Sequence, residues 1–255
     1  MKRFLVEAIE PSMDRLTITG REARYINNVL RMKKGQELII MDGKGLSFAC
    51  AIEKVSYQEV TVRIKGPLPP QLSSPIRITL CQAIIKAQAM DYVIQKATEL
   101  GVGAIRLFSS GRTVIKIEPG RTAAKMSRWK EIMKSACRQC NRADLPNLEP
   151  PVPFEEMLES TPKNNILKIL LWENEENLVL KEIFNRHSPP PHIWAAVGPE
   201  GGFSPDEIDA ARKSGFQTVS LGNRIIRADT AALSLLSIIQ YEWGDLNLRY
   251  EKTPC

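Results

Sequence analysis

The sequence predicts an α/β protein of two parts, a small β-rich domain followed by a larger domain with a mainly parallel sheet. Residues 3–66 consist mostly of short strand-like runs, and strand and helix patterns alternate from Ile76 to Trp243. Between them, Gly66–Pro75 holds four prolines in ten residues. Proline fixes φ and disfavours regular structure on both sides, so this segment marks a boundary. We therefore expect domains at residues 1–70 and 75–250.

The N-terminal part is predicted to be a small β-barrel with one inserted helix. β-branched and apolar residues dominate four runs, with a turn signal at Asp42–Gly45; the runs are Leu16–Thr19, Glu37–Met41, Leu46–Val55 and Val60–Lys65. A short helical pattern at Glu22–Leu30 interrupts them. No internal repeat is evident.

In the second part, each strand pattern is followed by a helix pattern, which is typical of a parallel sheet covered on both faces. The predicted strands are Ile76–Cys81, Ala104–Phe108, Ile166–Trp172, Ile193–Val197 and Phe216–Leu221. The predicted helices are Ala87–Leu100, Arg121–Cys140, a short acidic helix after Pro153, Leu178–Phe184, Ser204–Ser214 and Asp229–Trp243. Pro146–Pro153 is expected to break the chain. Ser204, Pro205 and Glu207 form a strong helix-start signal.

The last helix, Asp229–Trp243, is apolar nearly all round, so it needs burial on two sides. One side is expected to be its own sheet. The other is either a second copy of the chain, which would make this helix a homodimer interface, or more of the same monomer.

Composition is that of an ordinary globular protein, with 43% hydrophobic and 25% charged residues. No apolar run is long enough for a membrane span or a signal peptide, so we expect a cytoplasmic protein that does not bind membranes. Five scattered cysteines argue against a disulfide framework. Cys137 and Cys140 have CxxC spacing but lie inside a helical run without a second pair, so no metal site is predicted.

The net charge of +6 is unevenly placed. Residues 1–66 hold 12 Lys/Arg against 8 Asp/Glu, and residues 112–142 hold 9 against 2. Such blocks neutralise phosphates, although a single block is more often a solvated helix face. Two blocks in one chain favour a nucleic-acid partner.

Two glycine-bearing turns, Gly198–Gly202 and Leu221–Arg224, each follow an apolar strand and lead into a helix. Such turns let a ligand approach bare backbone groups, and two of them can enclose one ligand. Neither the dinucleotide fingerprint nor the P-loop is present. A tight structural turn requires the same glycines, so the first turn alone is a weak signal.

Together, GPEGGFSPDEI and LGNRIIRADTA closely resemble motifs of the ribosomal RNA small subunit methyltransferase E family, within the SPOUT class. Further similar blocks are Gln95–Val102, Arg128–Trp129 with Gln139 and Arg142, and Val29–Arg31. The chain departs from the family pattern at a few positions, namely Ile226, Asp229, Tyr25 and Gly111.

The resemblance implies a PUA-like β-barrel that binds RNA, followed by an α/β-knot domain with a deep trefoil knot. It also implies a homodimer and S-adenosylmethionine-dependent methylation of uridine N3 in small-subunit (16S) ribosomal RNA, either free or in the assembled subunit, without a metal. Three loops are expected to hold the cofactor: Leu171, Trp172, Glu173, Val197, Gly198, Pro199, Glu200, Gly201, Gly202, Leu221, Gly222, Arg224, Ile225, Ile226, Arg227, Thr230 and Ala231.

Arg227 is the candidate catalytic residue, because a fixed guanidinium stabilises charge that spreads onto the uracil carbonyls. The alternative is a salt bridge from Arg227 to Asp229 or Glu200. No general base stands out, and His187 and His192 are expected to be structural. Phosphate-binding candidates are drawn from both basic blocks: Arg3, Arg24, Arg31, Lys33, Arg112, Arg128, Arg138 and Arg142.

Three other functions compete with this hypothesis. A non-enzymatic RNA-binding assembly protein would share the basic blocks but would not bind S-adenosylmethionine. A nucleotide-dependent oxidoreductase would need the absent fingerprint. A SPOUT enzyme acting on transfer RNA is the nearest rival, and the family blocks outside the knot argue against it.

Overall fold

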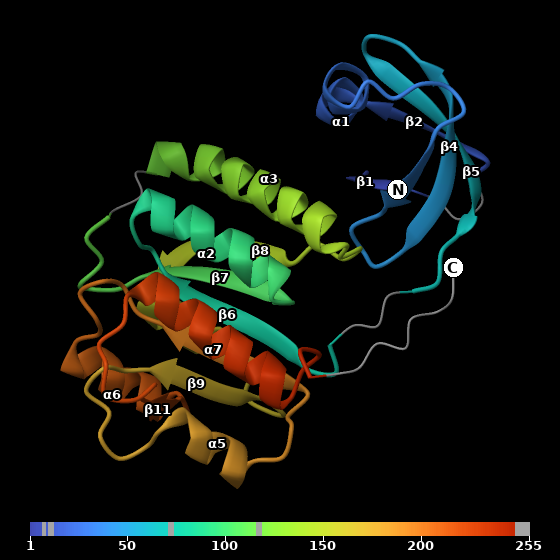
Figure 1. The fold of residues 1–255 in the computed structure, drawn as a ribbon. Coiled ribbons are helices and arrows are strands. Elements are labelled where there is room, and N and C mark those ends of the chain that lie inside the picture. Colours follow the sequence, from blue (N-terminus) through green and yellow to red (C-terminus); the bar gives the residue numbers. More distant parts are fainter. Residues whose placement is uncertain (7–8, 10–12, 71–73, 116–118, 248–255) are drawn as a thin grey trace. The chain divides into compact units, whose positions relative to one another are not determined.

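The computed structural model describes residues 1–6, 9, 13–70, 74–115 and 119–247 (Figure 1). Contacts divide the chain into two compact units, Met1–Leu72 with Lys134–Leu145, and Ser73–Met133 with Pro146–Cys255. Part of the predicted boundary, residues 71–73, lies outside the described residues. No helix in the described part is both long and apolar enough to cross a bilayer.

The first unit contains a curled five-stranded sheet (Figure 1). Its strand order is β1-β3-β4-β5-β2, formed by Lys2–Leu5, Glu37–Met41, Ser47–Val55, Glu59–Pro67 and Arg15–Thr19. β1 pairs with β3 in parallel and the other neighbours are antiparallel. The predicted small β-barrel is thus present as a curled sheet, and no pairing joins its edge strands β1 and β2 among the described residues. The sheet is a half-barrel.

One helical segment follows β2 in this unit, as the sequence predicted. It begins as α1 (Gly20–Arg24) and continues as a π-helical turn, η1 (Tyr25–Val29). Ala23 and Ile26 are buried with Phe4, Ile18 and other apolar residues of the curled sheet. The segment thus fills the open side of the half-barrel with apolar side chains.

Lys134–Leu145 also belongs to the first unit, whereas the proline-rich boundary predicted it within the second domain. Cys137 and Ala143 are buried in a cluster with Leu5, Ile39 and Met41. The backbone N–H of Leu145 donates to the carbonyl of Gly43 at 2.9 Å. These long-range contacts could not be inferred from the helical pattern of the segment.

The second unit is built on a six-stranded sheet in the order β11-β9-β10-β6-β7-β8. All its paired strands are parallel, as the sequence predicted. The strands are β6 (Arg77–Ala83), β7 (Ala104–Ser109), β8 (Asn147–Pro153), β9 (Leu167–Leu171), β10 (His192–Val197) and β11 (Gln217–Val219).

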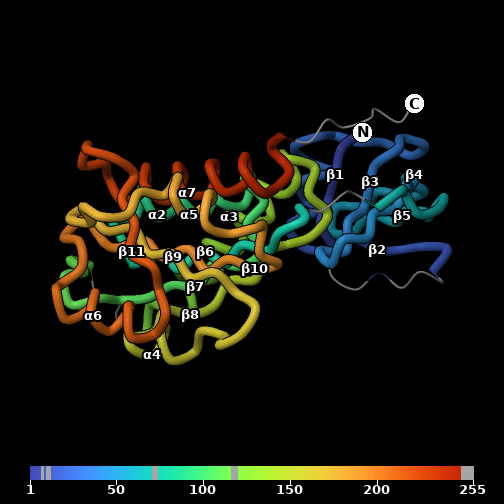
Figure 2. The backbone as a smooth tube through the Cα atoms, turned by 90° about the horizontal axis from the view of Figure 1, so that it is seen from below, coloured from blue at the N-terminus to red at the C-terminus, as the bar shows by residue number. Residues whose placement is uncertain are grey.

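Helices cover both faces of this sheet (Figures 1 and 2). α2 (Ala87–Glu99) and α7 (Ala228–Glu242) pack together on one face. On the other face, α4 (Phe154–Glu159) and α6 (Pro205–Lys213) enclose an apolar core that includes Phe108, Trp194 and Phe203. The remaining helices are α3 (Thr122–Cys140), preceded by the short turn η2 (Pro119–Arg121), and α5 (Leu180–Arg186).

The predicted break at Pro146–Pro153 is wrong, because Asn147–Pro153 forms β8. β8 lies at the end of the strand order and pairs only with β7. An edge strand tolerates prolines because the N–H groups on its outer side have no ladder partner to lose.

Candidate functional site

Three strands of the parallel sheet end side by side at the positions where the sequence placed its glycine turns. Leu171, the last residue of β9, is paired with Val197, the last of β10, and with Val219, the last of β11. The loops that follow therefore begin at the same level of one sheet edge. The carboxyl edge of a parallel sheet is where ligands of open α/β folds bind.

The loop after β11 crosses this edge. β11 is the outermost strand, whereas α7, the helix that follows, contacts β10 and β6. Residues 220–227 must therefore pass the end of β9 to reach the start of α7. This crossing brings Leu221–Arg227 to the loops after β9 and β10, which the order of the sequence alone would not establish.

The loop after β9 is held by a polar network. The buried carboxylate of Glu175 accepts hydrogen bonds from Thr218 Oγ1 (2.5 Å), Arg212 Nη2 (3.0 Å) and the N–H of Asn177 (3.0 Å). Burial alone would raise the pKa of Glu175, but these donors and the Arg212 charge hold that pKa below its ordinary value. Arg212 also lies 5.2 Å from the ring centre of Trp172. Trp172 and its loop are thereby fixed beside the strand ends.

The glycines of the loop after β10 are required by close packing of the protein on itself. A Cβ at Gly202, where φ is +68°, would meet Glu173 Oε1 at 2.1 Å. A Cβ at Gly201 would meet the carbonyl oxygen of Arg112 at 3.0 Å, and one at Gly198 would meet the Phe203 ring at 2.9 Å. These glycines therefore let neighbouring loops approach.

Gly222 differs from those three glycines. Its φ is +101°, and a Cβ there would have no heavy atom within 4 Å. Open space at a left-handed turn leaves the backbone accessible to a ligand. The predicted ligand-facing role therefore agrees best with this glycine, whereas Gly198, Gly201 and Gly202 shape the loop.

Two further segments are tied to the glycine loop by contacts that no local sequence pattern predicts. Glu200 Oε1 accepts a hydrogen bond from the N–H of Lys86, at the start of α2. Arg112 donates from Nη1 to the carbonyl of Gly201 at 3.3 Å. Arg112, predicted as a phosphate contact, thus lies against the loop proposed for the cofactor. Nothing near Lys86 in the sequence signalled its contact.

Glu207 connects the same region to the loop after β7. Its Oε2 accepts from the N–H of Ser204 at 2.8 Å and completes the predicted capping box of α6. Its Oε1 accepts from the N–H of Gly111, also at 2.8 Å. The sequence pattern identified only the first of these two contacts, since capping is local.

Arg227 directly precedes α7, and its carbonyl accepts from the N–H of Ala231 at 2.8 Å. Its side chain is exposed, and within the described residues it forms no ion pair with Asp229 or Glu200. Ile225 is 90% exposed on the same loop, whereas Leu221 and Ile226 are half-buried. The loop thus presents a guanidinium and apolar side chains together.

These three loops could hold a folded ligand with an apolar part and a polar part. Leu171 is buried at the end of β9, Pro199 is buried two residues after the end of β10, and the half-buried Leu221 and Ile226 supply further apolar surface. Open backbone at Gly222 supplies hydrogen-bonding groups.

Neither histidine belongs to these three loops, and Cys137 belongs to the first unit. His192 begins β10, at the opposite edge of the sheet, where its Nε2 lies 2.9 Å from Thr79 Oγ1. His187 follows α5 and lies beside Gln217. Burial raises the pKa of Cys137 to about 12, which disfavours the thiolate that redox chemistry needs. In the part of the chain that is described, no three His, Cys, Asp or Glu side chains gather as a possible metal site.

Apart from Arg112, which contacts the carbonyl of Gly201, the predicted phosphate-binding residues fall into two groups. Three arginines are paired with carboxylates of their own unit: Arg128 with Asp91 at 2.5 Å, Arg138 with Glu22 at 2.5 Å, and Arg142 with Asp144 at 2.7 Å. By contrast, Arg24, Arg31 and Lys33 are exposed, and Arg3 is half-exposed.

Comparison with known proteins agrees with this architecture. Residues 72–240 match the RNA methyltransferase domain model, and residues 18–65 match the RNA methyltransferase PUA domain model. The chain is 31% identical over 224 residues to ribosomal RNA small subunit methyltransferase E of Synechocystis sp., covering 88% of this chain and 72% of that protein.

Solved structures agree as well. A Legionella pneumophila methyltransferase with bound cofactor SAM matches with a TM-score of 0.88 and 33% identity, over 96% of this chain and 98% of that one. Ribosomal RNA small subunit methyltransferase E of Neisseria gonorrhoeae, bound to S-adenosyl methionine, gives a TM-score of 0.87 and 31% identity, over 96% and 99%. The chain therefore has the PUA-like and SPOUT α/β folds that its motifs implied, and it belongs to the ribosomal RNA small subunit methyltransferase E family of RNA methyltransferases.

Proposed function

We propose that this protein transfers a methyl group from S-adenosylmethionine to N3 of a uridine in small-subunit ribosomal RNA. The observation that carries the proposal is the register of β9, β10 and β11, which brings three loops to one level of the sheet edge. Family membership supports the cofactor and the RNA substrate. A ribosomal substrate also implies a cytoplasmic protein.

The loops fit a bent cofactor of this kind. Leu171, Leu221 and Ile226 offer apolar surface to an adenine, and the open backbone at Gly222 offers polar groups. When bound, S-adenosylmethionine supplies a methyl group already activated by its sulfonium, so no metal is needed. The chain's own residues must then orient the uracil and favour loss of the N3 proton.

We assign to Arg227 the task of favouring loss of the N3 proton. Its exposed guanidinium is carried at the start of α7, on the loop that crosses the strand ends. The absence of an intrachain ion pair within the described residues leaves its charge available to the uracil carbonyl oxygens. Removing one such preorganised donor costs about 10²–10³ in kcat.

A homodimer through α7 is part of the proposal. The helix buries Ala231, Leu235 and Ile239 against its own unit but leaves Ile238 37% and Tyr241 61% exposed. An apolar face of this kind at the helix beside the site would be covered by a second copy. Sedimentation of the wild type and of Tyr241→Glu tests this: the dimer model predicts that the charged variant sediments as a monomer.

The activity test uses small ribosomal subunits or their RNA prepared without the modification, incubated with the protein and methyl-labelled S-adenosylmethionine. Mass spectrometry of the digested RNA should show 3-methyluridine. If a parallel reaction with transfer RNA is labelled and the ribosomal RNA is not, or if neither RNA is labelled, the proposal is refuted.

The role of Arg227 needs a separate comparison. Arg227→Ala should lose about 10²–10³ in kcat while calorimetry shows cofactor binding retained, and Arg227→Lys should recover part of that loss. Arg186→Ala is the control, because this arginine pairs with Glu182 on α5. Wild-type turnover in Arg227→Ala would exclude the assignment.

A further inference from the structure

A small pocket lies at the carboxyl edge of the six-stranded sheet, within the second unit. Its volume is about 140 Å³, and the ends of β6, β7 and β8 meet there. The loop after β7 and the start of α3 complete its lining. Seven residues line it: Ile84, Ser109, Ile115, Thr122, Pro151, Val152 and Pro153. None of them belongs to the three loops proposed for the cofactor.

The strand ends around this pocket are held at one level. Ser109, the last residue of β7, is paired with Pro153, the last residue of β8. The N–H of Ile84, which follows β6, donates to the carbonyl of Phe108 at 2.8 Å. Because proline has a fixed φ, the wall formed by Pro151 and Pro153 loses little conformational freedom when a ligand binds.

The lining is uncharged and combines apolar surface with two hydroxyl groups. Among its apolar residues, Ile84 is buried and Val152 is half-buried. The hydroxyls of Ser109 and Thr122 have no hydrogen-bond partner within the described residues. A hydroxyl both donates and accepts, so these two groups can bond to the carbonyl and N–H groups at the edge of an unpaired base. The apolar side chains then contact the faces of the ring.

The size of the pocket restricts the occupant to a single ring. Sites for drug-sized molecules have about 300–1,000 Å³, so this pocket is too small for S-adenosylmethionine. A cavity of about 150 Å³ is enough to bind benzene. The pocket therefore admits one six-membered ring, as in a pyrimidine, but not the two fused rings of a purine.

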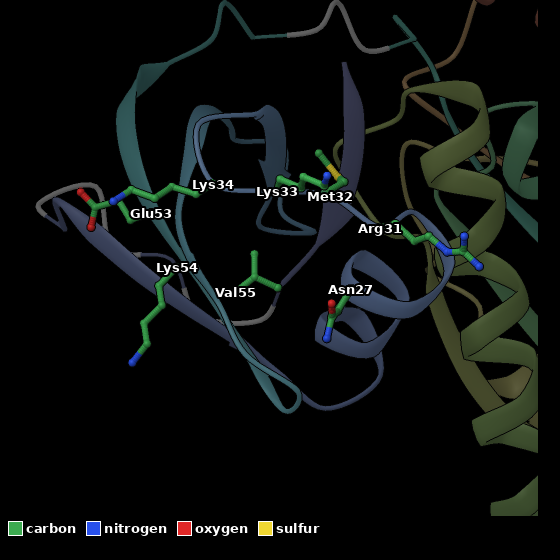
Figure 3. Close-up of a pocket in the computed structure, with 8 residues that line it drawn as sticks. All are labelled: Asn27, Arg31, Met32, Lys33, Lys34, Glu53, Lys54 and Val55. Atoms are coloured by element: carbon green, nitrogen blue, oxygen red, sulfur yellow. The ribbon is translucent and has the colours of Figure 1, made fainter.

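A larger hollow in the first unit has the opposite character (Figure 3). Its volume is about 700 Å³, and most of its lining residues are charged. They are Asn27, Arg31, Met32, Lys33, Lys34, Glu53, Lys54 and Val55. Such a lining responds to the charge of a ligand and does not distinguish one base from another. Recognition of a base requires the uncharged, ring-sized pocket of the second unit.

The chain that forms one wall of the pocket also supports the glycine loop after β10. The turn Ser110–Thr113 directly follows Ser109 of the lining, and it is closed by a hydrogen bond of 2.9 Å from the N–H of Ser110 to Thr113 Oγ1. Within this turn, Arg112 donates from Nη1 to the carbonyl of Gly201 at 3.3 Å. The pocket and the loop proposed for the cofactor are therefore neighbours on the same edge of the sheet.

The separation of the strands gives the distance between the two places. β6 and β7 follow β10 in the strand order, and neighbouring strands are about 4.8 Å apart, so the ends of β10 and β7 are about 10 Å apart. The base that accepts the methyl group must lie at the cofactor, so a ring in the pocket belongs to another nucleotide. Stacked nucleotides advance by about 3.4 Å each, which places this ring within about three nucleotides of the modified one.

We propose that this pocket binds one unstacked pyrimidine of the RNA substrate, within about three nucleotides of the modified uridine. The ring lies between the apolar side chains, and Ser109 and Thr122 bond to its edge, as unpaired bases are commonly recognised. Because a purine is too large, the pocket selects the sequence around the target. This inference rests on the proposed function for the nature of the substrate.

The test measures the affinity of the full-length protein for a labelled single-stranded fragment of small-subunit ribosomal RNA. Each nucleotide of the fragment is replaced in turn by an abasic nucleotide, which keeps the backbone and removes the base. One pyrimidine position should lose roughly tenfold in affinity, as expected for a base held by stacking. A purine at that position should weaken binding as much as the abasic nucleotide does.

Variants of the lining connect this position to the pocket. Ser109→Phe fills the pocket, so the intact fragment and the fragment abasic at that position should bind with equal affinity. Thr122→Val keeps the volume but removes one hydroxyl, and it should weaken binding of the intact fragment roughly threefold. Ser188→Phe, at an exposed serine ahead of β10, is the matched control and should bind both fragments as the wild type does. Calorimetry should give the wild-type affinity for S-adenosylmethionine in all three variants, which shows that they fold.

The pocket does not bind a base if no pyrimidine position is sensitive, or if Ser109→Phe leaves the abasic loss unchanged. A sensitive position more than about three nucleotides from the methylated uridine would contradict the distance given by the strands. If 3-methyluridine forms but no position responds to Ser109→Phe, this inference fails and the proposed function stands. If such a position is found but no 3-methyluridine forms, the proposed function fails and the pocket remains a pyrimidine site.

Discussion

Glu207 is the single side chain whose loss should most clearly uncouple the loops around the strand ends. It is 8% exposed, and its two carboxylate oxygens accept backbone hydrogen bonds from Ser204 and Gly111, each at 2.8 Å. In Glu207→Ala both N–H groups lose their partner. The Ser204 hydroxyl still accepts from the backbone N–H of residue 207, so half of the capping box survives.

The size of the effect follows from these contacts. A hydrogen bond to a charged group contributes about 1.5–3 kcal/mol, and loss of a helix cap costs about 0.5–2 kcal/mol. Gly111 is exposed and Ser204 is half-buried, so water replaces part of what is lost. We expect Glu207→Ala to lower the free energy of unfolding by roughly 2–4 kcal/mol. Glu207→Gln keeps one acceptor oxygen, so its free energy of unfolding should lie between those of Glu207→Ala and the wild type.

Urea unfolding followed by tryptophan fluorescence is a suitable assay, because all four tryptophans lie in the second unit: Trp129, Trp172, Trp194 and Trp243. Asp206→Ala is the matched control, an exposed carboxylate in the same first turn of α6. Its interaction with the helix dipole is worth about 0.3–1 kcal/mol. Equal unfolding midpoints for Glu207→Ala and Asp206→Ala would refute the coupling role. Calorimetry should also show weaker S-adenosylmethionine binding in Glu207→Ala only.

Three further predictions concern the second unit and α3. Burial acts to raise the pKa of Glu175, but its hydrogen-bond donors and the charge of Arg212 outweigh burial and hold that pKa below its ordinary value. The contribution of Glu175 to stability is therefore fully present above the ordinary carboxyl pKa and is lost as the pH falls through the lower folded-state pKa. In thermal melts, Glu175→Gln should show a smaller fall in melting temperature at acid pH than the wild type, and an equal fall would contradict this. Gly202→Ala should lower the free energy of unfolding by about 1–2 kcal/mol, because alanine is strained in this left-handed backbone conformation. It should also weaken cofactor binding, because the new Cβ would displace Glu173. In the double variant Gly202→Ala/Glu173→Ala the collision should be relieved, whereas the backbone strain should remain. Since burial raises the pKa of Cys137 to about 12, iodoacetamide at pH 8 should leave this thiol unmodified in the folded protein, as peptide mass spectrometry would show.

Most of the fold could be predicted because its signals are local. Alternating strand and helix patterns, the capping residues of α6 and the proline-rich segment all depend on residues a few positions apart. The errors arose where a distant partner decided the outcome. Prolines 150, 151 and 153 were expected to break the chain, but β8 pairs on one side only, so their missing N–H groups cost it little.

The candidate site, like the fold, could be predicted only where its signals are local. The sequence located both glycine turns and the motif around Arg227, but it could not distinguish glycines that make room for protein atoms from one that faces open space. Gly202 accommodates Glu173, whereas Gly222 has no neighbour. These contacts join residues from different loops, which local patterns do not encode.

By itself, the amino-acid sequence determined the order of the elements, the α/β class, the position of the glycine turns and the family. Only the tertiary structure decided which cations are neutralised and which remain available, because Arg138 meets Glu22 across more than a hundred residues of chain, while Lys33 and Lys54 meet no carboxylate within the described residues. The physical reason is that charge pairing depends on distance in space. The charge of a segment follows from its composition, but its electrostatic effect depends on what the fold brings beside it.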